Sequence, residues 1–140
     1  MYNSIDEAIK ILEPKGFKIN DPWDIVDAFE TLIATYSGSK YAVSCDSCTN
    51  AMFMSLKYLN AKGAINIPQK TYVSVPALII HSGCRIKFEN YEWSGIYQLE
   101  PYPIIDGATR FRKGMYKKGT FHCLSFHFKK ILPICKGGMI

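Results

Sequence analysis

The amino-acid sequence predicts an α/β fold, in which a mostly parallel sheet carries helices on both of its faces. Two observations predict it. Short apolar runs of strand length alternate along the chain with longer segments that have helical spacing, and this alternation is typical of parallel βαβ units. The chain has 140 residues, of which 48% are hydrophobic and 21% are charged, so its length and composition fit one globular domain.

Two helices are expected before the first strand. One covers residues 4–13 and ends before Pro14, because proline does not continue a helix. The next begins with Asp21 as its N-cap and Pro22 at its first helical position, and Gly38 can close it. Its apolar residues recur at helical spacing: Trp23, Val26, Phe29, Leu32, Ile33 and Tyr36.

Strands and helices alternate over the rest of the chain. The expected strands are the short apolar runs at 41–45, 64–67, 85–88, 103–106 and 122–125. Helices are expected between the first two strands, ending near Gly63, and over residues 73–82. In open sheets of this kind, ligands bind beyond the carboxyl ends of the strands. The residues that follow each strand are therefore the candidates for a site.

The composition argues against several classes of protein. No run approaches the ~20 apolar residues that a membrane span needs, and the N-terminus lacks the order of a secretory signal. The formal net charge of +5 is mild, so nucleic acid is not indicated. Five cysteines at irregular spacing indicate reduced thiols in the cytoplasm. The three histidines are isolated, so no metal site is expected.

The first candidate groups follow the first two strands. Free backbone N–H groups at the start of a helix, around Cys48, make a site for an anion together with the hydroxyls of Ser47 and Thr49. Simple N-capping by either hydroxyl is the alternative. After the second strand, Tyr72 can lay its ring against a flat aromatic ligand, or it can be an ordinary core or surface tyrosine.

The other candidate groups follow the last two strands. Asp106 ends one of them, and a carboxylate there can pair with a protonated ring nitrogen, although aspartate is also common in turns. The last strand ends at Ser125, whose hydroxyl can hold a phosphate, and Lys130 follows five residues later. An amine kept neutral in an apolar cleft is a nucleophile towards carbonyls. The alternative is that Lys129 and Lys130 are two solvated charges.

An anion cradle, an aromatic ring, a carboxylate and a lysine match what pyridoxal 5'-phosphate requires. The lysine forms a Schiff base with this cofactor, and the aspartate keeps its pyridine nitrogen protonated. The same segments resemble the DegT/DnrJ-type sugar aminotransferases, a family with the fold-type-I architecture of pyridoxal-phosphate enzymes. The similarity begins near Asp27 and reaches the last residue.

Four motifs carry this resemblance. Residues 47–49 read Ser-Cys-Thr where the family has the phosphate-holding Ser-Gly-Thr, and residues 68–72 are similar to Pro-x-x-Thr-aromatic, whose ring stacks on the cofactor. Residues 106–109 are similar to Asp-x-Ala-Gln or Asp-x-Ala-His. Residues 125–130 fit Ser-Phe-His-x-x-Lys, and this register selects Lys130 as the catalytic lysine.

The resemblance implies a function and a set of partners. It implies that an amino group passes from an amino acid donor to a keto sugar, expected to be nucleotide-linked, in a homodimer or another self-associated form. It assigns cofactor contacts to Ser47, Cys48, Thr49, Tyr72, Asp106, Thr109, Ser125 and Lys130.

The chain departs from the family in three places and in length. Cys48 replaces a glycine of the phosphate loop and can crowd the backbone's approach to a phosphate. Thr109 replaces a longer polar side chain, and Cys135-Lys136 replaces Gly-Glu, which reverses a charge. The family's chains are longer. We therefore expect N-terminal helices over residues 1–38 and the βαβ core of an incomplete large domain over residues 39–140, with the small C-terminal domain absent.

These departures leave two other functions open. One is a catalytically inactive remnant of the fold that binds or regulates without turnover. The other is thiol redox chemistry at Cys45-Asp-Ser-Cys48, a CxxC motif that follows a strand and enters a helix, where a thiolate is stabilised.

Overall fold

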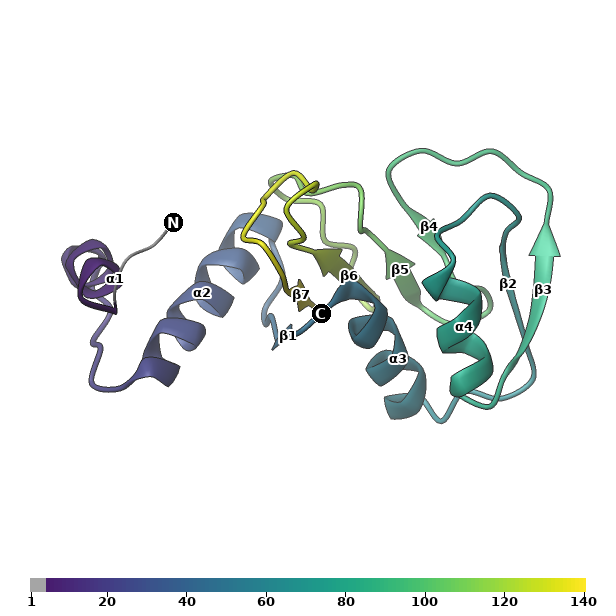
Figure 1. Cartoon of the computed structure of the whole chain (residues 1–140), viewed down its shortest axis with the longest axis horizontal. Coiled ribbons are helices and arrows are strands. Elements are labelled where there is room, and N and C mark those ends of the chain that lie inside the picture. The colour runs from purple at the N-terminus through teal and green to yellow at the C-terminus, as the bar shows by residue number, and fades with distance from the viewer. Residues whose placement is uncertain (1–4) are drawn as a thin grey trace.

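The computed structural model describes residues 5–140 and confirms the α/β class (Figure 1). Its helices are α1 (Ile5–Leu12), α2 (Pro22–Ser37), α3 (Cys48–Tyr58) and α4 (Ser74–His81), with a short 3-10 helix at Glu13–Lys15. Its strands are β1 (Ser44–Cys45), β2 (Ala64–Pro68), β3 (Arg85–Glu89), β4 (Tyr97–Gln98), β5 (Ile104–Asp106), β6 (Phe121–Ser125) and β7 (Gly138–Met139). Every expected helix and strand is present, and residue 4 of the first expected helix lies outside the described residues.

Helix α2 begins and ends where its sequence signals predict. The Asp21 carboxylate accepts a hydrogen bond of 2.7 Å from the backbone N–H of Trp23, and the Asp24 carboxylate accepts one of 3.2 Å from the backbone of Asp21. Gly38 ends the helix with a φ of 82°, in the left-handed region that glycine adopts at low cost. Only part of the apolar surface of α2 is covered, since Ile33 is buried while Trp23 is 75% exposed.

The strands of the described chain form two hydrogen-bonded groups. Five lie in the order β1-β7-β6-β5-β4, and β2 pairs with β3. The two groups meet where the backbone N–H of Asn66 donates to the carbonyl of Glu100 at 2.8 Å. The longest ladders, β2–β3 with five residue pairs and β5–β6 with three, are parallel. The pairs β1–β7, β6–β7 and β4–β5 have two residue pairs each and are antiparallel.

The antiparallel pairs come from β4 and β7, which sequence periodicity did not predict. Each of these strands has only two residues, too few to show an alternating pattern. The short turn over residues 99–103 joins β4 to β5, and a connection of this length leads to antiparallel pairing. Strand β7 inserts between β1 and β6.

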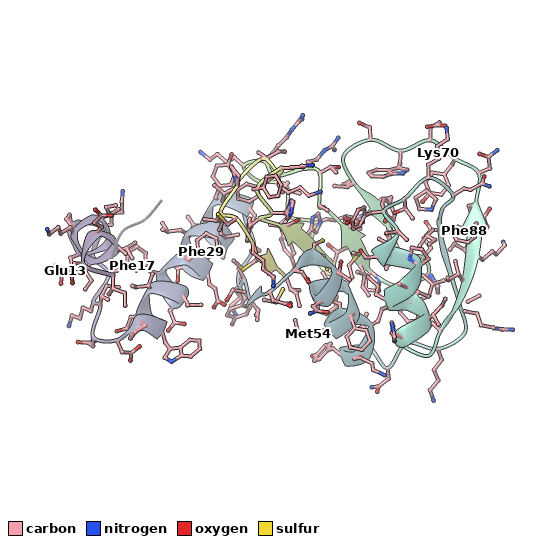
Figure 2. All side chains as sticks on the ribbon, viewed as in Figure 1. Glu13, Phe17, Phe29, Met54, Lys70 and Phe88 are labelled. Carbon is pink, nitrogen blue, oxygen red and sulfur yellow. The ribbon has the colours of Figure 1, made fainter. Side chains whose placement is uncertain are left out.

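Helices cover both faces of the five-stranded group. Successive side chains of a strand point to opposite faces, so Cys123 and Leu124 of β6 lie on different sides. Cys123 belongs to the larger core cluster with α3, whereas Leu124 packs in a second cluster with Ile33 of α2. Phe29 of α2, labelled in Figure 2, packs edge-on against Phe126 with 5.3 Å between ring centroids. Helix α1 lies beyond α2 and away from the sheet (Figure 1).

The segments that follow β2, β3, β5 and β6 lie along one edge of the molecule, which is the upper edge in Figure 1. The parallel strands end at this edge, where ligands are expected in open α/β sheets.

Candidate functional site

A cavity of about 520 Å³ opens at this edge of the sheet. Every residue to which the resemblance assigned a cofactor contact lines it: Ser47, Cys48, Thr49, Tyr72, Asp106, Thr109, Ser125 and Lys130. These residues come from four separate segments, so the fold brings together what the chain keeps apart. The volume is within the ~300–1,000 Å³ of small-molecule sites. The roles of these residues toward a ligand stay predictions.

The start of α3 forms one end of the cavity. Ser47 is its N-cap, and the Ser47 hydroxyl accepts a hydrogen bond of 3.2 Å from the backbone N–H of Asn50. The hydroxyl of Thr49 pairs with that of Ser74, at the start of α4, at 2.8 Å. The capping interpretation is therefore correct for Ser47. It is compatible with anion binding, because the first N–H groups of a helix have no partner within the helix.

Strand β7 passes against this helix start so closely that glycine is required. A Cβ atom at Gly138 would lie 2.5 Å from the backbone nitrogen of Cys48 and would overlap the backbone of Ser47. Gly138 also pairs with Cys45 of β1 and with Ser125 of β6. The glycine thereby holds α3 against the end of β6, which brings the two predicted phosphate contacts to one place.

Asp106 lies at the bottom of the cavity in a hydrogen-bonded group that we call the cavity floor, formed by Thr71, Tyr97, Asp106 and Ala108. Asp106 is 6% exposed. Its Oδ2 accepts a hydrogen bond of 2.7 Å from the Tyr97 hydroxyl, and its Oδ1 accepts one of 2.9 Å from the backbone N–H of Ala108. The Tyr97 hydroxyl also lies 2.5 Å from the Thr71 hydroxyl. Asp106 is thus a buried carboxylate with several partners, unlike an ordinary solvated turn aspartate.

The cavity floor favours the protonated form of Tyr97. Burial, followed by the negative charge of Asp106, raises the pKa of Tyr97. Its hydroxyl therefore stays protonated near neutral pH and donates to the carboxylate.

The side chain of Cys48 is directed toward the cavity floor. Its Sγ lies 3.2 Å from the backbone oxygen of Cys123 and 3.9 Å from Asp106 Oδ1. Burial, and then the charge of Asp106, raise the pKa of this thiol well above its ordinary value. Burial also raises the pKa of Cys45. A redox-active CxxC needs a stabilised thiolate, so these directions oppose the thiol-redox function.

The remaining wall is the segment between β6 and β7, residues 126–137, which we call the lysine loop. Lys130 is half-buried and lines the cavity. In the balance that sets the pKa of Cys48, burial is the largest effect and raises it, while the nearby charge of Lys130 lowers it. Lys129 is exposed, and its Nζ lies 5.5 Å from the ring centre of Phe128.

Two groups in this part of the cavity have no side-chain partner. Within residues 5–140, no hydrogen bond or ion pair of the Lys130 amine or of the Ser125 hydroxyl is found. An amine and a hydroxyl that face a cavity without a protein partner are available to a ligand.

Tyr72 and Trp93 form an aromatic wall of the cavity, and this wall differs from the sequence-based expectation. Tyr72 lines the cavity but is 73% exposed. Trp93, which was not predicted, lines it as well: its indole N–H donates to the carbonyl of Lys70 at 2.7 Å, and its ring meets Tyr97 edge-on at 4.7 Å. The Thr109 hydroxyl donates to the carbonyl of Gly95 at 3.0 Å.

Sequence reasoning missed Trp93 and Tyr97 as parts of the site, and it included Thr71 only as a member of the motif at residues 68–72. Tyr97 lies in a strand of two residues, and Trp93 lies in the segment before it, where no strand or helix pattern exists. The available signal was an aromatic-rich stretch between the third and fourth expected strands, at Tyr91, Trp93 and Tyr97.

Residues 5–140 lack two other kinds of feature. No group of three or more His, Cys, Asp or Glu side chains in this range is placed to hold a metal ion. None of the helices in the same range has the length and apolar character to cross a membrane.

Comparison with known proteins identifies both the family and the fold. Residues 4–96 match the model of the DegT/DnrJ/EryC1/StrS aminotransferase family. No curated protein matches the sequence.

Solved structures with the same fold are sugar and other aminotransferases. DesV from S. venezuelae, in complex with a ketimine intermediate, superposes with a TM-score of 0.66 at 16% identity, covering 96% of this chain and 48% of that one. The aminotransferase TlmJ from Streptoalloteichus hindustanus has a TM-score of 0.65 at 18% identity, covering 99% and 50%. A DegT DnrJ EryC1 StrS aminotransferase from Brucella abortus has a TM-score of 0.66 at 17% identity, covering 96% and 49%. The chain thus spans about half the length of these proteins.

Proposed function

Because the chain belongs to the DegT/DnrJ/EryC1/StrS aminotransferase family, we propose that it is part of a pyridoxal-phosphate-dependent sugar aminotransferase. In this proposal residues 1–140 belong to the cofactor-binding large domain, with its N-terminal helices over residues 1–38 and its βαβ core over residues 39–140, and the protein works in the cytoplasm. The observation that carries the proposal is the convergence of Asp106, Lys130 and the start of α3 on one cavity.

The residues of the cavity fit pyridoxal 5'-phosphate. When bound, this cofactor supplies a protonated ring that accepts the electron pair of a substrate carbanion. Asp106 is the one buried carboxylate that lines the cavity, and a carboxylate can accept the N–H of a pyridinium. The Ser125 hydroxyl and the free N–H groups at the start of α3 suit a phosphate.

Each side chain has a distinct task in this proposal. Lys130 would hold the cofactor through its amine, and the same amine, once displaced by the incoming amino group, would carry a proton as general base and acid. Asp106 would accept the N–H of the ring. Tyr72 would lie against the ring, and Ser47, Thr49 and Ser125 would hold the phosphate.

The charges of the cavity support a negatively charged substrate, such as a nucleotide-linked keto sugar, with an amino acid as amino donor. Besides Lys130, the cations Lys129 and Lys136 line the cavity, against the acids Asp46 and Asp106. The Asp46 carboxylate already accepts two hydrogen bonds from the Asn50 amide, of 2.7 and 2.9 Å. Lys129 and Lys136 thus remain to meet the diphosphate of such a sugar. One neighbour of similar fold, DesI, was solved with its TDP-sugar product.

Exposed apolar side chains near the cavity support self-association, as in a homodimer. They are Tyr72, Val73, Phe128, Ile131 and Ile134. Apolar side chains gathered near a functional cavity are typical of a surface that another chain covers.

Binding without turnover is the second candidate function. It is favoured by the departures from the family pattern that line the cavity, namely Cys48, Thr109 and Lys136. In this case the cofactor binds and no amino group is transferred.

One experiment separates the two functions. The chain is mixed with pyridoxal 5'-phosphate, glutamate and nucleotide-linked keto sugars, and the products are analysed by mass spectrometry, with Lys130→Ala as the control. An amino sugar formed by the parent chain and absent with Lys130→Ala supports the aminotransferase. A cofactor that binds without any product supports the second function, and the absence of cofactor binding contradicts both.

A further inference from the structure

We infer that Tyr97 is a positioning residue of the site, which holds the Asp106 carboxylate in the orientation that a protonated ring nitrogen needs. The inference rests on the proposed function and goes beyond it, because Tyr97 is not among the residues that line the cavity. The ligand class on which it acts is a pyridinium ring, recognised through Asp106.

The geometry places Tyr97 directly behind the carboxylate. Tyr97 is 5% exposed, and its hydroxyl donates to Asp106 Oδ2 at 2.7 Å. Since the single hydroxyl proton is used in this bond, the oxygen of Tyr97 accepts from the Thr71 hydroxyl at 2.5 Å. Thr71, Tyr97 and Asp106 therefore form a directed chain of hydrogen bonds that ends on the carboxylate.

The acceptor sites of Asp106 show what this chain of bonds achieves. A carboxylate has about four lone-pair sites on its two oxygens. Oδ1 accepts the bond from the backbone N–H of Ala108 at 2.9 Å and has the Cys48 thiol beside it at 3.9 Å. Oδ2 accepts only the Tyr97 hydroxyl among residues 5–140. One acceptor site on Oδ2 thus remains for a donor in the cavity that Asp106 lines.

The hydroxyl of Tyr97 also offsets the cost of burying the Asp106 carboxylate. A buried carboxylate is costly unless it is hydrogen-bonded, and the Tyr97 hydroxyl supplies such a bond at 2.7 Å. Only the ionised acid can form a charge-assisted hydrogen bond with a pyridinium. A phenylalanine at this position would fill the same space and would supply neither the donor nor the orientation.

Tyr97 is itself held from two sides. The ring of Trp93 meets it edge-on at 4.7 Å, and Trp93 is fixed by its bond to the Lys70 carbonyl. Thr71 precedes Tyr72, the residue proposed to lie against the ring. The same chain of bonds thus connects the aromatic wall to the carboxylate.

The test measures how the 140-residue chain binds two cofactors, with Tyr97→Phe as the variant. The cofactors are pyridoxal 5'-phosphate and its 1-deaza analogue, in which carbon replaces the ring nitrogen. The analogue cannot use Asp106 through a ring N–H, so it reports every effect of the substitution that does not pass through the carboxylate. Absorbance titration gives both dissociation constants, and urea unfolding shows that each variant is folded.

We expect Tyr97→Phe to weaken binding of pyridoxal 5'-phosphate about tenfold, as for the loss of one hydrogen bond to a charged group. Binding of the 1-deaza analogue should change less than about twofold. Thr71→Val removes the hydroxyl that pairs with Tyr97, so it should weaken binding of pyridoxal 5'-phosphate by a smaller factor and leave the analogue nearly unchanged. Thr71→Ser keeps the hydroxyl and should bind both cofactors as the parent chain does. This second pair keeps the test informative if Tyr97→Phe does not fold.

Tyr102→Phe is the matched control. The Tyr102 hydroxyl makes two hydrogen bonds to the backbone of Lys62, of 2.7 and 2.8 Å, and it does not line the cavity. This variant should leave binding of both cofactors unchanged.

If Tyr97→Phe weakened the binding of both cofactors equally, or weakened the binding of neither, the role of Tyr97 would be overturned while the proposed function stands. A parent chain that binds neither cofactor would overturn the proposed function and this inference together.

Discussion

The cavity floor and the lysine loop are built in opposite ways. In the cavity floor, buried Tyr97 and Asp106 are joined by short hydrogen bonds that use the hydroxyl of Thr71 and the backbone of Ala108. The lysine loop is mostly exposed, and the amine of Lys130 has no partner within residues 5–140. The cavity floor is therefore held in place before any ligand binds, whereas the lysine loop is held mainly at its two ends.

This difference matches the two kinds of chemistry proposed for the site. A carboxylate that orients a ring works best when its own hydrogen bonds hold it in place, because little reorganisation then accompanies binding. A lysine that forms a bond and moves a proton has to be unpaired and mobile. Segments with few buried contacts and exposed backbone hydrogen bonds supply that mobility.

The lysine loop also carries backbone strain that the cavity floor lacks. Cys135 has a φ of 75°, in the left-handed region that side chains other than glycine adopt at a cost. The resemblance described above predicts a glycine at this position. The strain explains why a glycine is suited to this position, and it is local to the loop.

Removing the carboxylate of the cavity floor should have the largest effect. Asp106→Ala deletes the acid and removes the acceptor of the Tyr97 hydroxyl and of the Ala108 N–H. We expect binding of pyridoxal 5'-phosphate to weaken about a hundredfold, since a charge-assisted bond and its supporting network are both lost. Absorbance titration measures the change. Asp46→Ala, which removes another acid of the cavity, is the control. An equal loss of cofactor binding in this variant would contradict the proposal that Asp106 is the acid that pairs with the ring.

Filling the space at Gly138 should push β7 and the start of α3 apart. Gly138→Ala places a Cβ against the start of α3, so β7 or α3 has to move. We expect the free energy of unfolding to fall by about 2 kcal/mol, a typical cost of overpacking, as measured by urea denaturation.

Gly107→Ala is the graded comparison for this variant. Its Cβ would meet the Cys123 oxygen at 3.2 Å, a milder contact than at Gly138, and we expect a cost below about 1 kcal/mol. If Gly107→Ala cost more than Gly138→Ala, the close approach of β7 to α3 would not be what holds the site together.

Relieving the strain of the lysine loop should have a smaller, stabilising effect. In Cys135→Gly the residue can keep its φ of 75° without strain. We expect the free energy of unfolding to rise by about 1 kcal/mol, and binding of the cofactor to change little. Cys135→Ala is the control, because it removes the thiol and keeps the strain. Equal stabilisation by both variants would show that the thiol and not the backbone is responsible.

Much of the fold could be predicted from local signals. Asp21, Pro22 and Gly38 fix the two ends of α2 through interactions within a few residues, so the sequence alone identifies them. The parallel ladders β2–β3 and β5–β6 lie in apolar runs of strand length. The strands β4 and β7 could not be predicted, because two residues carry no periodicity and their pairing depends on distant partners.

The candidate site shows the same limit. The four segments that carry the predicted residues of the cavity were identified because each follows a strand or fits a motif. The roles of Tyr97 and Trp93 depend on contacts across the cavity floor, such as the bond between Tyr97 and Asp106, which no local pattern encodes. The direction of the Cys48 side chain toward Asp106 likewise follows from packing and not from the motif.

We propose that Asp106 and Lys130 serve one bound cofactor, and the lysine allows a direct test of this. The chain is incubated with pyridoxal 5'-phosphate, reduced with borohydride and digested, and the labelled peptide is sequenced by mass spectrometry. We expect a label on Lys130 that persists in Lys129→Ala and disappears in Lys130→Ala. A label on Lys129 or spread over the surface lysines, with none on Lys130, would contradict it.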